Sequence, residues 1–81
     1  MKTVFLRKFI ENYPKFSKTV QDKFQKQLNY LLVNTKHPSL NSKKYDKKNN
    51  IWQARVDRSV RFYFYIKENI VFIIDIKNHP K

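Results

Sequence analysis

The second half of the chain alternates apolar and polar side chains, a pattern that predicts three β-strands at Ile51–Asp57, Val60–Lys67 and Ile70–Lys77. Successive side chains of a strand point to opposite faces of the sheet. Each predicted strand therefore has one apolar side and one polar side. The breaks between the strands, Arg58-Ser59 and Glu68-Asn69, are short enough for hairpins. The pattern predicts an antiparallel meander with one oily face and one basic, aromatic face.

The same alternation assigns each side chain to a face. The face expected to be apolar carries Trp52, Ala54, Val56, Val60, Phe62, Phe64, Ile66, Ile70, Phe72, Ile74 and Ile76. The opposite face is expected to carry Gln53, Arg55, Asp57, Arg61, Tyr63, Tyr65, Lys67, Val71, Ile73, Asp75 and Lys77. If the last strand keeps its alternation, His79 lies on this second face as well. Candidate functional side chains are thus concentrated on the basic face.

A short strand and two helices are expected before the meander. Lys2–Leu6 is β-branched and aromatic, as strands prefer, and Arg7–Tyr13 suits a short helix that Pro14 ends. Ser17 is a good N-cap for a longer helix. In Lys18–Asn34 the apolar residues recur at helical spacing, so one side of this helix should pack on the sheet.

The segment between the long helix and the meander is polar and rich in lysine. Pro38 breaks the helix, because proline disfavours the helical conformation of the residue before it. Lys43–Tyr45 is expected to form an edge strand whose lysines discourage aggregation. The chain has no glycine, so its left-handed turn positions should fall to asparagine. The asparagines at proposed breaks are Asn34, Asn41, Asn49, Asn50, Asn69 and Asn78.

These elements follow the order β-α-α-β-β-β-β and predict an α+β, two-layer fold in which both helices cover one sheet face. The length suits a single domain, residues 1–81, with one modest core. Cysteine is absent and only two histidines are present, so the sequence predicts no disulfide and no metal site. No apolar run approaches the ~20 residues of a membrane span, and Arg7 and Lys8 interrupt the N-terminus too early for a signal peptide. We expect a soluble, cytoplasmic protein.

Net charge changes the functional picture more than any other global property. Eighteen lysines and arginines against six acids leave +12. A field of this size indicates a polyanionic partner, such as nucleic acid, an acidic protein or an anionic membrane surface. The alternative is a lysine coat that only keeps the protein in solution. Aromatic residues interleaved with the basic ones favour nucleic acid, bound directly or on the ribosome.

Four stretches of the chain match a known pattern when taken in order. An amphipathic helix is followed by H-P-S-L at His37–Leu40, and then by the lysine-rich segment Lys43–Lys48. Next come W-x-x-R-V…R-F-Y-F, from Trp52 to Phe64, and I-x-I-x-x-H, from Ile74 to His79. Over nearly its whole length the chain resembles the RelE/ParE superfamily of toxins from bacterial type II toxin–antitoxin systems, near RelE and YoeB. The resemblance implies sheet order 1-5-4-3-2, mainly antiparallel.

The resemblance also implies an activity. Most members near this pattern are ribosome-dependent endoribonucleases that cut messenger RNA in the ribosomal A site. The 2′-hydroxyl attacks the neighbouring phosphate and expels the 5′-oxygen, which requires a base, cations for the phosphate oxygens and an acid, but no metal and no cofactor. The implied partners are a cognate antitoxin protein, the ribosome and mRNA, with no membrane.

The family's functional positions fall on the basic face. Arg61 matches the phosphate-stabilising arginine, His79 the acid/base position, and Arg55 a basic residue that contacts RNA. For Arg61, the competing explanation is an ion pair with Asp57 or Asp75. The further residues expected to contact RNA are Lys43, Lys44, Lys47, Lys48, Tyr63, Tyr65 and Lys77.

Two departures from the family pattern keep other functions open. No tyrosine follows His79, and His37–Leu40 contains no acid, so the usual catalytic set is incomplete. One alternative is a ParE-like inhibitor of DNA gyrase, which cuts nothing. The other is a catalytically inactive toxin homologue or a plain nucleic-acid-binding domain.

Overall fold

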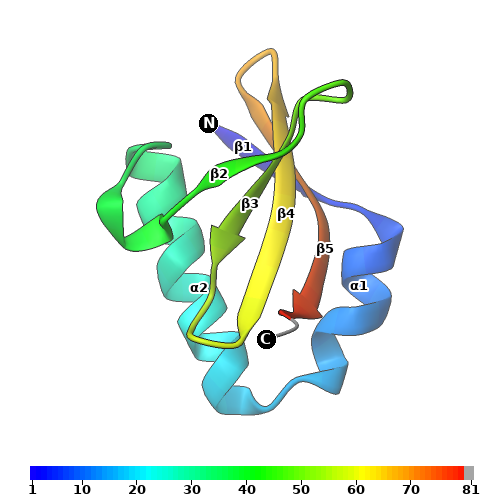
Figure 1. The fold of residues 1–81 in the computed structure, drawn as a ribbon. Coiled ribbons are helices and arrows are strands. Elements are labelled where there is room, and N and C mark those ends of the chain that lie inside the picture. The colour runs from blue at the N-terminus through cyan, green and yellow to red at the C-terminus, as the bar shows by residue number, and fades with distance from the viewer. Residues whose placement is uncertain (80–81) are drawn as a thin grey trace.

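A computed structural model describes residues 1–79 and has a five-stranded sheet with two helices. The elements are β1 (Lys2–Phe5), α1 (Arg7–Asn12), the 3-10 turn η1 (Tyr13–Lys15), α2 (Lys18–Val33), the 3-10 turn η2 (Pro38–Leu40), β2 (Lys43–Asp46), β3 (Ile51–Arg55), β4 (Val60–Lys67) and β5 (Ile70–Asn78). The sheet order is β1-β5-β4-β3-β2, with β1 parallel to β5 and every other pair antiparallel (Figure 1). The predicted α+β fold and strand order are confirmed.

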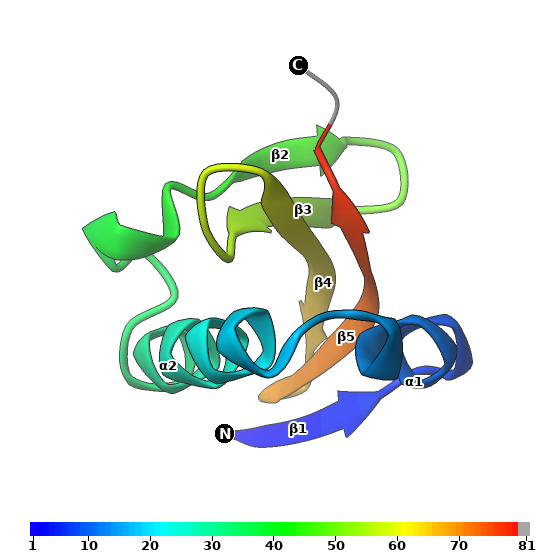
Figure 2. The ribbon, with the colours of Figure 1, turned by 90° about the horizontal axis from the view of Figure 1, so that it is seen from below.

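Both helices lie on the same side of the twisted sheet, and β2 lies toward the other side (Figure 2). The core between the layers is built from α1, α2, η2 and the meander, and its buried members are Phe9, Phe24, Leu28, Leu31, Leu40, Ala54, Val56, Val60, Phe62, Phe64, Val71, Ile73 and Ile76. Phe24 of α2 contacts Phe62 of β4 edge-on, with ring centroids 5.2 Å apart. One face of the sheet is therefore left without helices.

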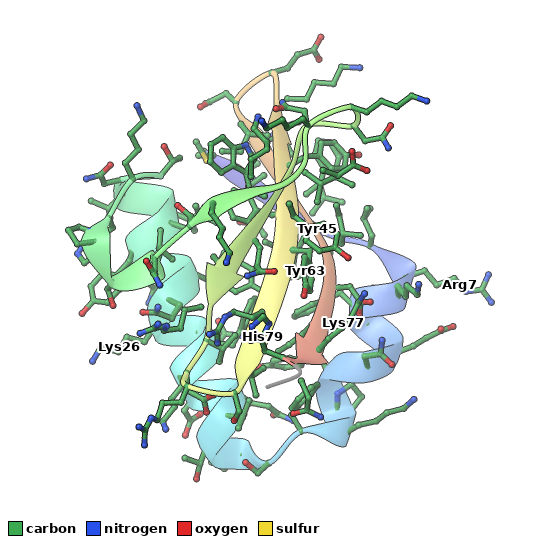
Figure 3. The ribbon with its side chains drawn as sticks, viewed as in Figure 1. Arg7, Lys26, Tyr45, Tyr63, Lys77 and His79 are labelled. Carbon is green, nitrogen blue, oxygen red and sulfur yellow. The ribbon has the colours of Figure 1, made fainter. Side chains whose placement is uncertain are left out.

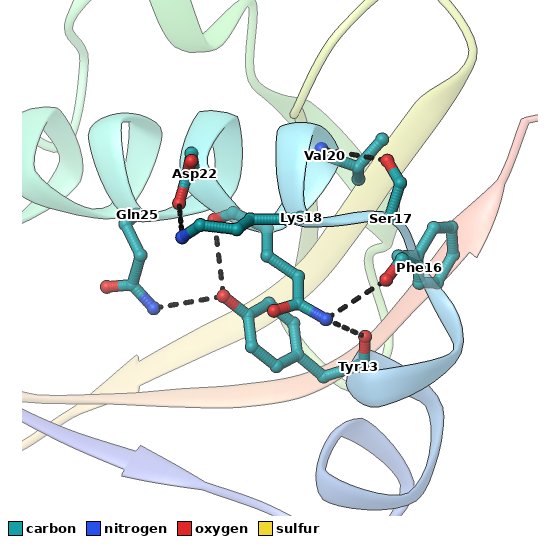
Figure 4. Close-up of polar contacts among 8 residues, drawn as sticks. Tyr13, Phe16, Ser17, Lys18, Val20, Asp22 and Gln25 are labelled. Atoms are coloured by element: carbon teal, nitrogen blue, oxygen red, sulfur yellow. Dashed lines mark hydrogen bonds and ion pairs between the residues drawn. The ribbon is translucent and has the colours of Figure 1, made fainter.

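Polar contacts connect α2 to the turn η1 that precedes it (Figure 4). Ser17 caps α2 as predicted, because its hydroxyl accepts a hydrogen bond from the Val20 amide at 3.2 Å. The Gln21 side-chain amide donates to the carbonyls of Tyr13 and Phe16, which ties α2 to the turn before it. Within residues 1–79, no helix is both long and apolar enough to cross a bilayer.

The register of β3, β4 and β5 places one apolar row beside one basic row. Ala54 lies opposite Phe62, and Phe62 lies opposite Ile76; all three are buried in the core. One residue further along each strand, toward the β3–β4 loop, the side chains turn to the open face. The core row therefore determines which side chains are displayed next to one another on the open face.

The predicted alternation of β5 is wrong in its first half. A register shift between Tyr63 and Phe64 of β4 leaves Ile74 of β5 as an extra residue, since Tyr63 pairs with Asp75 and Phe64 with Ile73. The core residues of this strand are consequently Val71, Ile73 and Ile76, rather than Ile70, Phe72, Ile74 and Ile76. From Asp75 onward the alternation agrees with the prediction.

Asparagine takes some, but not all, of the left-handed positions. Asn41, Asn50 and Asn69 have positive φ, as predicted, whereas Asn34 is extended with φ −152°. Within the described residues Asn49 and Asn78 are not left-handed either. Glu68, with φ 52°, joins Asn69 in a two-residue hairpin, because a type I′ turn needs positive φ at both central residues.

A buried glutamine connects α2 to the sheet and to η2. Gln27 is 6% exposed. Its Nε2 donates to the carbonyl oxygens of Ser39 and Arg55, each at 2.8 Å, and its Oε1 accepts from the Ser39 hydroxyl at 3.0 Å. These bonds satisfy the carbonyl of Ser39 in η2 and that of Arg55 at the end of β3.

Replacing Gln27 by alanine should destabilise the fold, because it removes the donor of the Arg55 and Ser39 carbonyls at a buried position. We expect a loss of about 1–3 kcal/mol of unfolding free energy, measured by urea denaturation. Asn29→Ala, an exposed change on the same helix, should stay within about 0.5 kcal/mol of the wild type. Equal losses in the two variants would show that the glutamine has no special role.

Candidate nucleic-acid interface

Three cations lie side by side across the open face. Arg55 of β3 is directly opposite Arg61 of β4, and Arg61 is directly opposite Lys77 of β5. We call this set the cationic row. Like charges directly opposite one another in a sheet are destabilising. An anion bound over the row would relieve this repulsion.

No carboxylate within residues 1–79 neutralises the cationic row. The ion pairs among these residues are Arg7–Glu11, Lys18–Asp22 and Lys23–Asp57. The predicted alternative for Arg61, an ion pair with Asp57 or Asp75, is therefore absent from this part of the chain. Asp75 instead accepts hydrogen bonds from the Asn12 side chain and the Ile76 amide, both at 2.8 Å.

Arg61 is held by main-chain oxygens of the β3–β4 loop. Its Nη1 donates to the carbonyls of Asp57, at 2.6 Å, and Val60, at 3.1 Å. The loop itself is braced by the Asp57 carboxylate, which accepts from the amides of Ser59 and Val60 at 2.9 Å. Because carbonyls carry no net charge, the guanidinium keeps its full positive charge in a fixed position. Its remaining N–H groups have no partner in the described part of the chain and can bind an anion.

His79 lies at the same end of the open face. Its amide donates to the Ser59 carbonyl at 2.6 Å, which attaches the segment after β5 to the β3–β4 loop. Figure 3 shows His79 and Lys77 near each other in front of the sheet. The fold thus brings the three predicted catalytic residues, Arg55, Arg61 and His79, to one face and one end of the sheet.

An aromatic pair adjoins the cationic row. Tyr63 is two residues after Arg61 on β4, and the Lys77 ammonium lies 5.0 Å from the centre of its ring. Tyr45 of β2 contacts Tyr63 with ring centroids 4.8 Å apart and an angle of 63° between the rings. Burial raises the pKa of the Tyr63 phenol above its ordinary 10.0, with a smaller contribution from Tyr45, while nearby Arg61 opposes the shift.

Tyr65, the other predicted base-stacking residue, is already stacked within the protein. Its ring lies on Phe72 of β5, with centroids 4.7 Å apart and an angle of 12°. It is also two positions further from Arg61 along β4 than Tyr63 is. The structure therefore places Tyr63, and not Tyr65, beside the cationic row.

The predicted RNA-binding lysines do not share one surface. Lys43 lies opposite Gln53 of β3, whereas the Lys44 ammonium lies 4.3 Å from the centre of the Trp52 ring, on the other side of the strand. Lys47 and Lys48 are exposed in the turn after β2. The side chain of Asn49 braces that turn through Asp46, and this hydrogen bond lowers the pKa of the Asp46 carboxyl.

A basic groove of about 510 Å³ extends the positive surface beyond the sheet. It runs between α2, η2 and the end of β3, and its cations are Lys23, Lys26, Arg55 and Arg58. Arg55 lines the groove and also belongs to the cationic row, so the two surfaces are continuous. Within residues 1–79, no three metal-binding side chains come close enough to hold an ion.

Comparison with solved structures gives matches over nearly the whole chain. YoeB in the YoeB–YefM complex of Staphylococcus aureus aligns with 18% identity and a TM-score of 0.82, covering 99% of this chain and 98% of that one. RelE in the Escherichia coli RelBE toxin–antitoxin complex aligns with 16% identity, a TM-score of 0.78 and coverage of 99% and 98%. A YoeB/ParE toxin from Agrobacterium tumefaciens aligns with 13% identity, a TM-score of 0.77 and coverage of 99% and 100%. No family model matches the sequence, and no curated protein does.

The chain has the YoeB/RelE toxin fold. Within this fold, the cationic row lies on the open face at the end of the meander nearest the β3–β4 loop. The groove lies beside it along α2. Four residues near these surfaces were missed by reasoning from the sequence: Tyr45, Lys23, Lys26 and Arg58. The lysines lie on the polar side of the α2 pattern, and no local signal separates them from ordinary solvated lysines. Tyr45 falls in the predicted edge strand two residues after Lys43, so alternation within that strand was the signal that could have placed it on the open face.

The shifted pKa of Tyr63 makes stability depend on alkaline pH. Because the folded-state value is raised, the phenol's contribution is complete below about pH 10 and is lost as pH rises through the folded-state value. Urea denaturation of the wild type and Tyr63→Phe should therefore show a difference in unfolding free energy that is constant below about pH 10 and shrinks as pH rises above it. A difference independent of pH would mean that Tyr63 ionises equally easily in the folded and unfolded chain.

Proposed function

We propose that this protein is the toxin of a type II toxin–antitoxin pair and a metal-independent, ribosome-dependent endoribonuclease. The observation that carries the proposal is the cationic row: three cations in register on adjacent strands, with no carboxylate partner within residues 1–79. A phosphodiester supplies the missing negative charge. The likeness to YoeB and RelE supports the proposal through the fold.

Each residue has a role in this reaction. The 2′-hydroxyl of one nucleotide attacks the adjacent phosphorus, and the bond to the 5′-oxygen breaks. Arg61 stabilises the negative charge that builds up on the phosphate oxygens, and Lys77 and Arg55 hold the flanking backbone. One proton leaves the 2′-hydroxyl and one joins the leaving 5′-oxygen; His79 carries out one of these transfers, and water carries out the other. The products are a 2′,3′-cyclic phosphate and a 5′-hydroxyl.

Replacing Arg61 by alanine should abolish RNA cleavage and growth inhibition. One preorganised donor to a developing oxyanion typically accounts for a rate factor on the order of 10²–10³. Arg61→Lys should recover only part of the activity, because an ammonium cannot donate like a planar guanidinium. Arg7→Ala is the matched control: Arg7 lies on α1, away from the open face, in an exposed ion pair with Glu11 (Figure 3).

Three outcomes of this comparison are informative. An active, correctly folded Arg61→Ala protein would remove the catalytic assignment. Loss of folding in Arg61→Ala, measured by circular dichroism, would make it a structural arginine, since its Nη1 bonds hold the β3–β4 loop. Filamentation and DNA damage, with transcripts intact, would favour a gyrase inhibitor; one structural relative is described as a YoeB/ParE toxin.

Changing Lys43, Lys47 and Lys48 together to glutamine should weaken ribosome binding and reduce its salt dependence, with the slope falling by about one for each phosphate that the variant no longer binds. The control removes the same charge elsewhere, through Lys8, Lys15 and Lys18, which lie on the helical side. Binding is measured as a function of salt concentration. If both triple variants weaken it equally, Lys43, Lys47 and Lys48 contribute only to the net charge and form no specific contact with RNA.

The partner should be an antitoxin with an acidic or amphipathic segment. Relatives with this fold were crystallised with YefM and with RelB, and a net charge of +12 favours an anionic counterpart. We expect association of the neighbouring gene's product to slow steeply as ionic strength rises, measured by stopped flow. A rate independent of salt would exclude electrostatic steering.

A further inference from the structure

The edge strand β2 carries a bulge at Tyr45. Lys44 pairs with Trp52 and Asp46 pairs with Ile51, so Tyr45 has no opposite residue on β3. Tyr45 comes two residues after Lys43, which lies opposite Gln53, so alternation along β2 places Tyr45 over the open face, where its ring contacts Tyr63. In Figure 3, Tyr45, Tyr63, Lys77 and His79 follow one another down the front of the sheet.

The two tyrosines differ in what they offer a ligand. Tyr63 is 7% exposed and lies against Lys77, whereas Tyr45 is 56% exposed. Because the rings meet at 63°, they do not cover each other face to face. Tyr45 thus keeps open aromatic surface while its contact with Tyr63 limits its movement.

We propose that Tyr45 is a stacking platform for one nucleobase of the RNA strand whose phosphate lies on the cationic row. This inference rests on the proposed function, and it adds a base subsite to the phosphate site. Tyr63, the residue that Tyr45 touches, is two positions from Arg61, and two strand residues span roughly 7 Å. This span is comparable to the reach from a phosphate to the base of a neighbouring nucleotide.

Stacking suits the position of Tyr45 better than reading of base edges. Every base has a π face, so a single ring binds any nucleotide and fixes its orientation. The lysine over Tyr63 adds positive charge beneath the stack. Held at both base and phosphate, the nucleotide would keep its 2′-hydroxyl in line with the phosphate to be attacked. Tyr45 is thus a positioning residue for the reaction.

The test compares Tyr45→Ala with Tyr45→Phe and Tyr45→Trp. Binding is measured with a hexanucleotide of 2′-O-methyl RNA, which cannot be cut, and cleavage with mRNA on programmed ribosomes. Tyr45→Ala should weaken both by about 5- to 100-fold, the factor expected for one stacked base. The phenylalanine and tryptophan variants should stay near wild type, because they keep the ring. Tyr30→Ala, which removes a tyrosine from α2, is the control.

A photochemical measurement locates the base directly. The same hexanucleotide with one 5-iodouridine is irradiated in the complex, and the modified residue is identified by mass spectrometry. We expect the adduct on Tyr45. An adduct only on lysines, or a Tyr45→Ala protein that binds and cuts as well as wild type, would overturn the subsite. If Tyr45→Phe is as damaged as Tyr45→Ala, the hydroxyl is the functional group and the stacking role is wrong.

These results separate the subsite from the proposed function. Hexanucleotide binding that depends on the Tyr45 ring, in a protein that cuts no mRNA, would retain the subsite and remove the endoribonuclease. If Tyr45→Ala cleaves mRNA as well as the wild type does, the endoribonuclease is retained and the subsite is removed. If the wild type does not bind the hexanucleotide, the subsite is overturned. The same holds if Tyr45→Ala binds the antitoxin more weakly than the wild type does but binds RNA as well as the wild type.

Discussion

The register between β3, β4 and β5 is the constraint on which the rest of the molecule depends. Ala54, Phe62 and Ile76 lie in one buried row, and a slip of one residue would move each of them to the open face. The hydrophobic effect therefore fixes the register. The same register forces Arg55, Arg61 and Lys77 into adjacency, an arrangement that their charges alone would oppose. Burial of the apolar row therefore keeps the cationic row together, in position to bind an anion.

Two local irregularities complete the open face. The extra residue Ile74 lets β5 contribute Val71 and Ile73 to the core and still present Lys77 beside Arg61. The edge strand β2 has a second bulge, beside Tyr45, whose ring contacts Tyr63. Both are bulges, which are frequent next to functional sites because they redirect side chains without ending a strand. The rigid meander and the braced β3–β4 loop supply the preorganisation that electrostatic catalysis requires.

Local patterns in the sequence predict most of the fold and part of the site. The alternation in Val60–Lys67 correctly separates Phe62 and Phe64 from Arg61, because no bulge interrupts that strand's own side-chain pattern. Alternation fails at Ile74, because a bulge depends on packing against α1 and β4 and not on the residue itself. It also fails at Glu68, where the hairpin imposes a left-handed conformation on a residue that does not favour it.

The site shows the same division. The grouping of Arg55 with Arg61 follows from strand parity and can be read from the sequence. The anchoring of Arg61 by the carbonyls of Asp57 and Val60 cannot, since backbone oxygens leave no signature in residue types. The groove at Lys23 and Lys26 likewise forms only when α2 meets the end of β3. Tertiary contacts, rather than local preference, therefore decide which of the many cations are close together.

The central claim is that the cationic row promotes attack of a 2′-hydroxyl on the adjacent phosphate. The most direct measurement is end analysis of mRNA incubated with the protein on programmed ribosomes, using one message with ribose throughout and one with a single 2′-deoxynucleotide at the cut position. The account predicts a 2′,3′-cyclic phosphate on the upstream fragment, a 5′-hydroxyl on the downstream fragment, and no cut in the substituted message. Fragments with 5′-phosphate ends, or cleavage of the 2′-deoxy message at the same position, would contradict it.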